Sequence, residues 1–93
     1  MGLTYAPEAV EFLRTVAPGP KRKLRHALDA LKRDPRPPGM DWRRLESSST
    51  VDQVYRLAVG DYRIAYVLRG RNVRIVKVFH RGEGYSWLER LGY

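Results

Sequence analysis

The pattern of hydrophobic and polar positions divides the chain into two halves. Residues 2–6 (GLTYA) predict a short edge strand, and Pro7 then suits the first position of a helix, where Glu8 is favourable near the positive helix end. The apolar residues that follow a helical spacing are Ala9, Val10, Phe12, Leu13 and Val16. The sequence APGP at 17–20 ends this helix.

A second helix is predicted to open at Pro20 and to stop at the sequence DPRPPG, residues 34–39. Its apolar stripe consists of Leu24, Ala27, Leu28 and Leu31. Basic side chains occupy much of its remaining surface. The first half of the chain therefore predicts a strand followed by an antiparallel helical hairpin.

The second half changes to the period of a strand. Residues 51–68 are rich in β-branched and aromatic side chains and are interrupted only by a Gly-Asp dipeptide at 60–61, a favourable two-residue hairpin turn. RGRN at 69–72 predicts the next turn, 73–80 a third strand, and 85–93 a short amphipathic helix. We expect an α+β fold in which two N-terminal helices pack on a small antiparallel sheet, followed by a short C-terminal helix.

The predicted hairpin register assigns each side chain to one face of the sheet. With Gly60 and Asp61 as the turn, one face is apolar or aromatic and should pack on the helices; it holds Tyr55, Leu57, Val59, Tyr62, Ile64 and Tyr66. The other face carries Arg56 and Arg63 as diagonal neighbours with two alanines between them. Two like charges above small side chains favour an anionic ligand.

If side chains of the third strand alternate in the same register as those of the hairpin, this strand adds residues to both faces of the sheet. The expected members of the helix-packed face are Ile75, Lys77 and Phe79. The expected members of the arginine-bearing face are Val76, Val78 and His80. Arg81 and Tyr85 follow closely enough to border the same region. A register slip of one residue would reverse the third-strand assignments.

Composition narrows the possible chemistry. The chain has 93 residues, which we expect to form a single domain over 1–93, and 18 Lys and Arg against 10 Asp and Glu give a net charge of +8. Such a charge favours a polyanionic partner: nucleic acid, an anionic membrane surface or an acidic protein. The absence of cysteine excludes disulfides, thiolate zinc sites and cysteine nucleophiles. No apolar run suits a membrane span and no signal peptide is recognisable, so we expect a cytoplasmic protein.

Five candidate residues from three predicted elements converge on one region: Arg56, Arg63, His80, Arg81 and Tyr85. Together they offer phosphate binding, a group that titrates near neutral pH and a phenol that can exchange a proton. Each residue taken alone has an ordinary surface or hydrogen-bonding role as its alternative. Neither a metal nor a cofactor is predicted.

Two segments carry a resemblance to a known family. VYRLAVGDYRIAYVL at 54–68, followed by VKVFHRGEGY at 76–85, resembles the RelE/ParE superfamily of bacterial toxin–antitoxin toxins. The opening YAPEAVEFLRTV resembles the first strand and helix of that family. The resemblance implies a microbial-ribonuclease-like fold. For the RelE branch it implies cleavage of messenger RNA in the ribosomal A site.

Carried over by position, the resemblance implies catalytic roles for Arg63, Arg81, Tyr85 and His80. Arg56 matches the first basic position of the family's hairpin, and the resemblance implies that Arg56 and Arg74 bind RNA. Ala58 stands where the family commonly has a second basic residue, so one phosphate contact or proton-transfer group of the family is missing. The ParE branch poisons DNA gyrase instead and generally lacks this full set of residues.

The sequence therefore predicts a type II toxin that cleaves messenger RNA on the ribosome by attack of the 2′-oxygen on the adjacent phosphate. A non-enzymatic gyrase inhibitor and a weakened RNA- or ribosome-binding relative are the alternatives. The resemblance also implies a cognate antitoxin with an acidic and apolar segment, bound in a hetero-oligomer. The C-terminal apolar residues either contribute to that interface or dock on the chain's own sheet; they are Trp87, Leu88, Leu91 and Tyr93.

Overall fold

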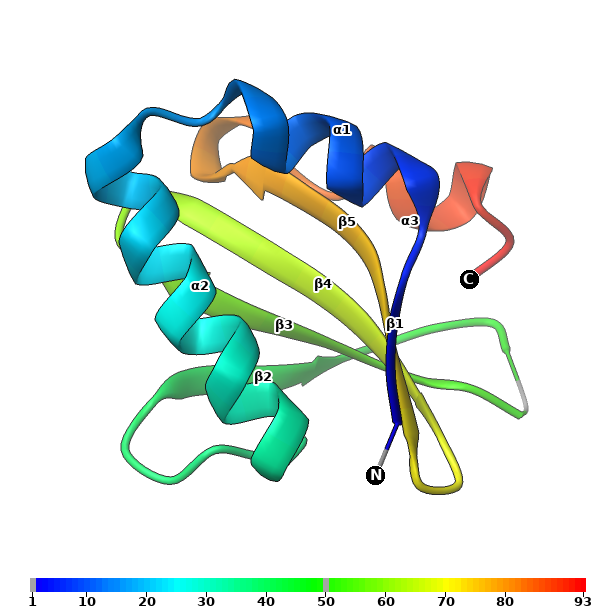
Figure 1. The fold of residues 1–93 in the computed structure, drawn as a ribbon. Helices are drawn as coiled ribbons and strands as arrows, with labels where there is room; N and C mark the ends of the chain where they lie inside the picture. Colours follow the sequence, from blue (N-terminus) through cyan, green and yellow to red (C-terminus); the bar gives the residue numbers. More distant parts are fainter. Residues whose placement is uncertain (1, 50) are drawn as a thin grey trace.

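The computed structural model describes residues 2–49 and 51–93, which form a five-stranded sheet with helices on both faces (Figure 1). The elements are β1 (Gly2–Tyr5), α1 (Pro7–Thr15), α2 (Pro18–Arg33), β2 (Asp41–Leu45), β3 (Gln53–Val59), β4 (Tyr62–Arg69), β5 (Asn72–His80), the 3₁₀ turn η1 (Arg81–Glu83) and α3 (Ser86–Arg90). The strand order is β1-β5-β4-β3-β2. β1 runs parallel to β5, and every other neighbouring pair is antiparallel. The predicted α+β fold is confirmed.

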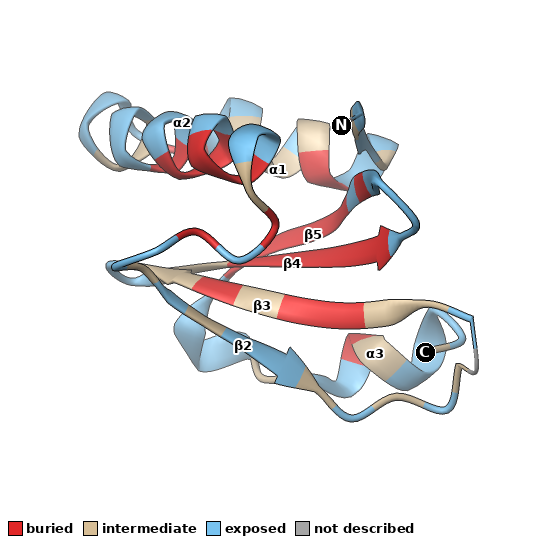
Figure 2. Ribbon diagram, turned by 90° about the horizontal axis from the view of Figure 1, so that it is seen from below, coloured by how far each residue is buried: buried red, intermediate tan, exposed pale blue. Residues whose placement is uncertain are grey.

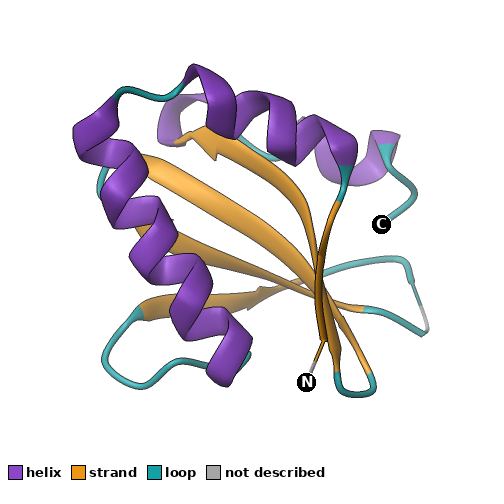
Figure 3. Cartoon of the chain, viewed as in Figure 1, coloured by secondary structure: helices purple, strands orange, loops and turns teal. Residues whose placement is uncertain are grey.

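Helices α1 and α2 cover one face of the sheet and α3 covers part of the other (Figures 2 and 3). The larger apolar cluster lies under α1 and α2 and includes Leu24, Leu31, Leu57 and Ile64. A smaller cluster lies between the sheet and α3, and its members are Val54, Ala65, Val67, Val76, Phe79 and Trp87. The sheet therefore has two buried faces, and the smaller cluster leaves room beside α3 for polar side chains.

Prolines set where both N-terminal helices begin. Pro7 opens α1 as predicted, with Glu8 in the first turn. Pro18 opens α2, rather than Pro20; Pro20 lies in the first turn, where backbone N–H groups have no partner inside the helix. In the part of the chain that the structure describes, no helix is long and apolar enough to cross a membrane.

Strand β2 is the element that sequence patterning does not predict. Its sequence, DWRRL, has no clear alternation, and of its five residues only Trp42 packs on the larger cluster. It forms an edge strand paired with β3, with Trp42 opposite Leu57. An edge strand needs few apolar residues, because one side of its backbone and much of its surface face solvent.

The β3–β4 hairpin has the predicted register. Val59 is paired with Tyr62, so Gly60 and Asp61 form the turn, and Gly60 has φ 57°, which a residue without Cβ adopts easily. Arg56 lies opposite Ala65, and Ala58 lies opposite Arg63. The faces predicted for this hairpin are therefore confirmed.

The faces predicted for the C-terminal half of β5 are wrong. The β4–β5 pairing shifts register between Ala65 and Tyr66, so Val76 is an extra residue in β5. Ile75 and Val76 keep their predicted faces, but the parity beyond them is reversed. Val78 and His80 consequently lie on the helix-packed face, and Lys77 and Phe79 lie on the opposite one.

Tyr66 ties the core to the segment that follows α2. Its side chain is fully buried, its ring stacks on Tyr55 with centroids 5.4 Å apart, and its hydroxyl donates a hydrogen bond to the carbonyl oxygen of Pro35. Burial, with a smaller contribution from Tyr55, raises the pKa of the Tyr66 phenol well above its ordinary value of 10.0. The folded chain therefore retains a proton that the unfolded chain releases in alkali.

Stability should fall as the pH rises above about 10, because only the unfolded state then loses the phenolic proton. Tyr66→Phe should lower the free energy of unfolding by about 1–2 kcal/mol at neutral pH, since the Pro35 carbonyl loses its donor. The variant should also lose less stability in alkali than the native chain. Urea unfolding at pH 7, 10 and 11 measures both effects; an equal alkaline loss in the two proteins would contradict the assignment.

Candidate functional site

The sheet face opposite α1 and α2 carries arginines on three adjacent strands, and Arg43, Arg56 and Arg63 together are called the arginine face. Arg43 and Arg56 are direct cross-strand partners on β2 and β3, and Arg63 lies diagonally across on β4. Nη1 of Arg56 is 2.9 Å from the carbonyl oxygen of Asp41 and 3.2 Å from its carboxylate. Like charges directly opposite one another are unfavourable, so the face favours an additional anion.

Sequence patterning does not predict Arg43 as a residue of the functional site. Its position depends on β2, and the DWRRL segment carries too weak a period to predict a strand. The pair of adjacent arginines at 43–44 was the available signal. Pairing with β3 places Arg43 on the face of Arg56, whereas Arg44 is paired with Tyr55 on the helix-packed face.

The Gly60–Asp61 turn brings Arg63 and Arg81 together. Nη1 of Arg63 donates hydrogen bonds to the carbonyl oxygens of Gly60, at 2.9 Å, and Tyr62, at 2.8 Å. The backbone N–H of Arg81 donates to the carbonyl oxygen of Asp61 at 2.8 Å, and its Nε lies 3.5 Å from the Asp61 carboxylate. Both guanidinium groups are thus held at one corner of the sheet, and both are suited to binding a phosphate.

Tyr85 borders the arginine face through Phe79. Phe79 is the cross-strand partner of Arg63, and its ring meets the Tyr85 ring edge-on, with centroids 5.6 Å apart. The Tyr85 side chain remains 37% exposed. The predicted convergence is therefore observed for Arg56 and Arg63, with Tyr85 and Arg81 at their border.

His80 does not join this group. It is paired with Tyr62 on the helix-packed face, and the two rings meet edge-on at 5.8 Å. Its Nδ1 accepts a hydrogen bond from the N–H of Gly82 at 3.3 Å, which caps the η1 turn. The prediction that His80 lies on the arginine-bearing face of the sheet is wrong, because the bulge in β5 reverses the parity of the strand end.

Arg74 lies on the same sheet face as Arg63, but towards the other end of the strands. It is paired with Val67 near the start of β5, at the end of the strand remote from η1. Its Nη1 is 3.4 Å from the Thr4 hydroxyl on β1, and the residue is exposed. Any contact that Arg74 makes with RNA is therefore separate from the contacts of Arg63.

Helix α3 docks on the chain's own sheet and supports the segment that carries Tyr85. The Trp87 side chain is 1% exposed, packs at 5.5 Å from Phe79 and donates a hydrogen bond from Nε1 to the carbonyl oxygen of Gly84. Leu88 and Tyr93 are partly buried in the same cluster, whereas Leu91 is exposed. In the structure, Trp87, Leu88 and Tyr93 therefore dock on the chain's own sheet, and Leu91 remains exposed.

Lys77 joins α1 to the turn after β5. It is the one buried charged residue in the described part of the chain, and its Nζ lies 2.9 Å from Glu8 and 3.2 Å from Glu83. Burial opposes its charge, but the hydrogen bonds that its Nζ donates to both glutamates outweigh this and raise the pKa of Lys77. The hydrogen bond from Lys77 lowers the pKa of Glu8 despite some desolvation.

Lys77→Met should flatten the loss of stability in acid. Because the pKa of Glu8 is lowered by folding, its contribution is present above the ordinary value of 4.5 and is lost as the pH falls through the folded value. The variant keeps the buried length of the side chain and should lose about 1 kcal/mol at pH 7, since both glutamates are half-exposed. Urea unfolding at pH 7, 5, 4 and 3 tests this; parallel acid profiles for the two proteins would contradict it.

Solved structures with the same fold include chains of RelE and YoeB. A chain of the archaeal RelE–RelB complex from Pyrococcus horikoshii OT3 has a TM-score of 0.76 at 23% identity, covering 89% of this chain and 97% of that chain. A chain of the RelB–RelE antitoxin–toxin complex from Methanococcus jannaschii has a TM-score of 0.73 at 19% identity, with coverages of 90% and 96%. A chain of the YoeB dimer from Staphylococcus aureus has a TM-score of 0.65 at 19% identity, covering 86% of this chain and 97% of that chain. At these identities the likeness establishes the fold.

The comparison with protein families covers nearly the whole chain. No curated protein sequence matches it. The family model described as "ParE toxin of type II toxin-antitoxin system, parDE" matches residues 4–85. The resemblance to the RelE/ParE superfamily is thereby confirmed, and the chain belongs to the ParE toxin family of type II toxin–antitoxin systems.

Proposed function

We propose that this toxin is a metal-independent endoribonuclease that cleaves messenger RNA on the ribosome. The observation that carries the proposal is the gathering of Arg56 and Arg63 on one sheet face, with Tyr85 at its border and Arg81 at the adjoining turn. Two guanidinium groups held at one turn can bind a phosphate, and the accessible phenol near them can exchange a proton.

The reaction proposed for this face is an internal attack within the RNA. The 2′-oxygen loses its proton to a base and forms a bond to the adjacent phosphorus. The bond from phosphorus to the 5′-oxygen breaks, and the 5′-oxygen takes up a proton. The products are a 2′,3′-cyclic phosphate and a 5′-hydroxyl end. Arg63 and Arg81 would stabilise the negative charge that develops on the phosphate oxygens, because both stay cationic and can bind two oxygens at once.

The remaining residues have supporting roles in this proposal. Tyr85 would exchange a proton with the RNA or stack on a base. Arg43 and Arg56 would hold the backbone on either side of the reacting phosphate. His80 receives a structural role, since its ring caps the η1 turn on the other side of the sheet.

Dependence on the ribosome follows from what the arginine face lacks. No histidine lies on the arginine face in the described residues, and the basic position that the family commonly has in β3 is occupied by Ala58. A site with few proton-transfer groups gains most from a substrate that is already held in the reactive geometry. Purified protein should therefore cleave naked RNA weakly, and strong cleavage of naked RNA would contradict this part of the proposal.

A cognate antitoxin is the proposed regulatory partner. Two of the similar structures are toxin–antitoxin complexes, and the net charge of +8 suits an acidic partner. We place the complex of toxin and antitoxin in the cytoplasm, where translating ribosomes are found.

The test is to map the 5′ ends of a defined messenger RNA after induced expression of the native chain or the Arg63→Ala variant. Cuts at translated codons that disappear in the variant would support a ribosome-dependent nuclease. Growth arrest with intact message would overturn it.

A gyrase inhibitor is the second candidate, favoured by the match to the ParE family model and by Ala58. The discriminating measurement is the supercoiling of relaxed plasmid DNA by purified gyrase in the presence of the toxin. Inhibition that persists in Arg63→Ala, without cleavage of message, would favour this candidate over the nuclease.

A further inference from the structure

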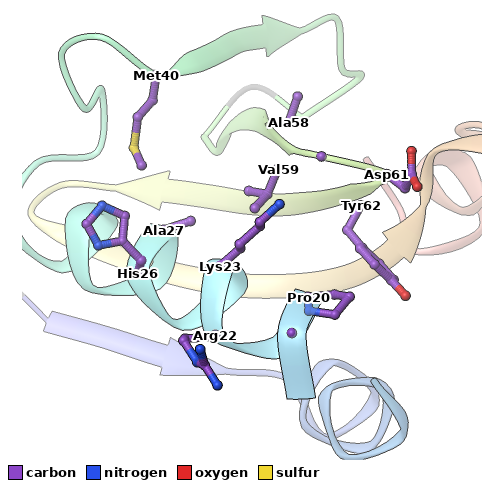
Figure 4. Close-up of a pocket in the computed structure, with 12 residues that line it drawn as sticks. Pro20, Arg22, Lys23, His26, Ala27, Met40, Ala58, Val59, Asp61 and Tyr62 are labelled. Carbon is purple, nitrogen blue, oxygen red and sulfur yellow. The ribbon is translucent and has the colours of Figure 1, made fainter. Parts of the chain in front are cut away.

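A groove of 760 Å³ separates the N-terminal half of α2 from the β3–β4 hairpin (Figure 4). Met40 and His26 lie at one end of the groove, and Pro20 and Tyr62 lie at the other. Lys23 lies between them on α2. Because α2 covers the sheet face opposite the arginine face, this groove is a separate surface from the one that holds Arg56 and Arg63.

The α2 side of the groove carries positive charge without counterions. Arg22 and Lys23 line it and are both exposed. In the described residues, no ion pair involves any of the six basic residues of α2, which are Lys21, Arg22, Lys23, Arg25, Lys32 and Arg33. The acidic residue in the groove, Asp61, is already paired with Arg81. An anion in the groove would therefore meet cations that the protein itself leaves uncompensated.

Rings and apolar side chains make up much of the rest of the lining. His26 and Tyr62 each contribute a ring, and Ala27, Met40 and Val59 contribute apolar surface. Cations combined with exposed rings are the means by which proteins hold single-stranded nucleic acid: the cations bind phosphates, and the rings stack on bases. A folded duplex, whose bases are already stacked, would make no use of the rings.

The groove reaches the hairpin turn, whose residues Gly60 and Asp61 contact Arg63 and Arg81. Ala58 and Asp61 line the groove. Ala58 is also the cross-strand partner of Arg63, and Asp61 is bound to Arg81. A strand that leaves Arg63 and passes around the turn therefore enters the groove next.

We infer that this groove binds single-stranded RNA, as the continuation of the strand that is cleaved at the arginine face. The inference rests on the proposed function for the identity of that strand. Arg22 and Lys23 would hold its phosphates, and His26 and Tyr62 would contact its bases. The chain would thus grip its substrate on both sides of the β3–β4 turn.

Fluorescence anisotropy with a labelled, 2′-O-methylated RNA of about 12 nucleotides tests this, because such an RNA binds but has no 2′-hydroxyl to attack. The test variant is Arg22→Glu with Lys23→Glu. The matched control is Lys32→Glu with Arg33→Glu, which makes the same charge change on exposed residues at the far end of the same helix, outside the groove. Circular dichroism checks that each variant is folded. A milder pair, Arg22→Gln with Lys23→Gln, repeats the test without charge reversal.

We expect the groove variant to weaken RNA binding at least 10-fold at about 0.1 M salt. The slope of log affinity against log salt concentration should fall by the amount expected for the loss of roughly two phosphate contacts. The control should weaken RNA binding less than about 3-fold, because it changes only the long-range electrostatic attraction between the protein and RNA. Equal losses in the two variants would overturn the inference. Binding of an acidic amphipathic peptide in the groove, with RNA affinity unchanged by the groove variant, would overturn it in favour of a protein occupant.

Failure of this inference can be told apart from failure of the proposed function. Cleavage of translated message by the native chain, with unchanged RNA binding in the groove variant, would overturn the groove site alone. Groove-dependent binding of RNA without any cleavage would support the groove site and contradict the nuclease.

Discussion

Arg63→Ala is expected to lower the rate of message cleavage at translated codons by at least about 100-fold, the usual cost of removing one donor that stabilises transition-state charge. Arg63 stands on β4, in the arginine face, and one of its nitrogens is fixed by the carbonyl oxygens of Gly60 and Tyr62. A guanidinium that is held in place before the substrate arrives loses little freedom when it binds a phosphate. Single-turnover cleavage on ribosomes stalled at a defined codon gives the rate directly.

The control for this prediction is Arg14→Ala. Arg14 lies on α1, is exposed and is paired only with Glu11 on the same helix, so its removal lowers the net charge equally. Its cleavage rate should stay within about 2-fold of the native value, since exposed ion pairs of this kind contribute little. Because Arg63 also bonds the hairpin turn, its urea midpoint is measured in parallel. Arg63 would be excluded from the proposed active site if the loss of cleavage rate matched the loss of folded protein. It would also be excluded if folded Arg63→Ala cleaved at the native rate.

Trp87→Ala should lower the free energy of unfolding by about 3–5 kcal/mol, the range for truncating a buried aromatic side chain. Trp87 is 1% exposed and fills the smaller cluster beneath α3. α3 has only five residues, too few to be stable as an isolated helix, so its position depends on this packing. The loss is a large part of the 5–15 kcal/mol that is typical of a whole domain.

Urea unfolding followed by circular dichroism measures this loss, with Leu91→Ala as the matched control. Leu91 follows α3 and is 39% exposed, so its truncation should cost less than about 0.5 kcal/mol. Trp87→Phe should fall between the two, since it retains part of the buried area. If Trp87→Ala and Leu91→Ala had equal stabilities, α3 would not be docked as described. Tyr85 should lose its order together with α3, so cleavage should decline before the sheet unfolds.

Local patterns in the sequence determine much of this protein. The prolines in the first turns of α1 and α2, the helical spacing of Leu24 and Leu28, and the Gly60–Asp61 turn each act over a few residues. A two-residue turn fixes the register of its two strands, and the period of two then assigns every side chain to a face. The placement of Arg56 and Arg63 on one face therefore follows from the sequence alone.

Tertiary structure decided the rest of the site. β2 is recognisable only once β3 offers it a partner, so Arg43 joins the site through a long-range pairing. The extra residue at Val76 has no local signal, yet it moves His80 away from the arginine face and brings Lys77 and Phe79 to that face. The groove beside α2 likewise exists only because the helix packs next to a hairpin that is distant in sequence. Turns and periodicity are encoded by neighbouring residues, whereas strand partners and bulges depend on contacts between distant segments, which the folded chain alone brings together.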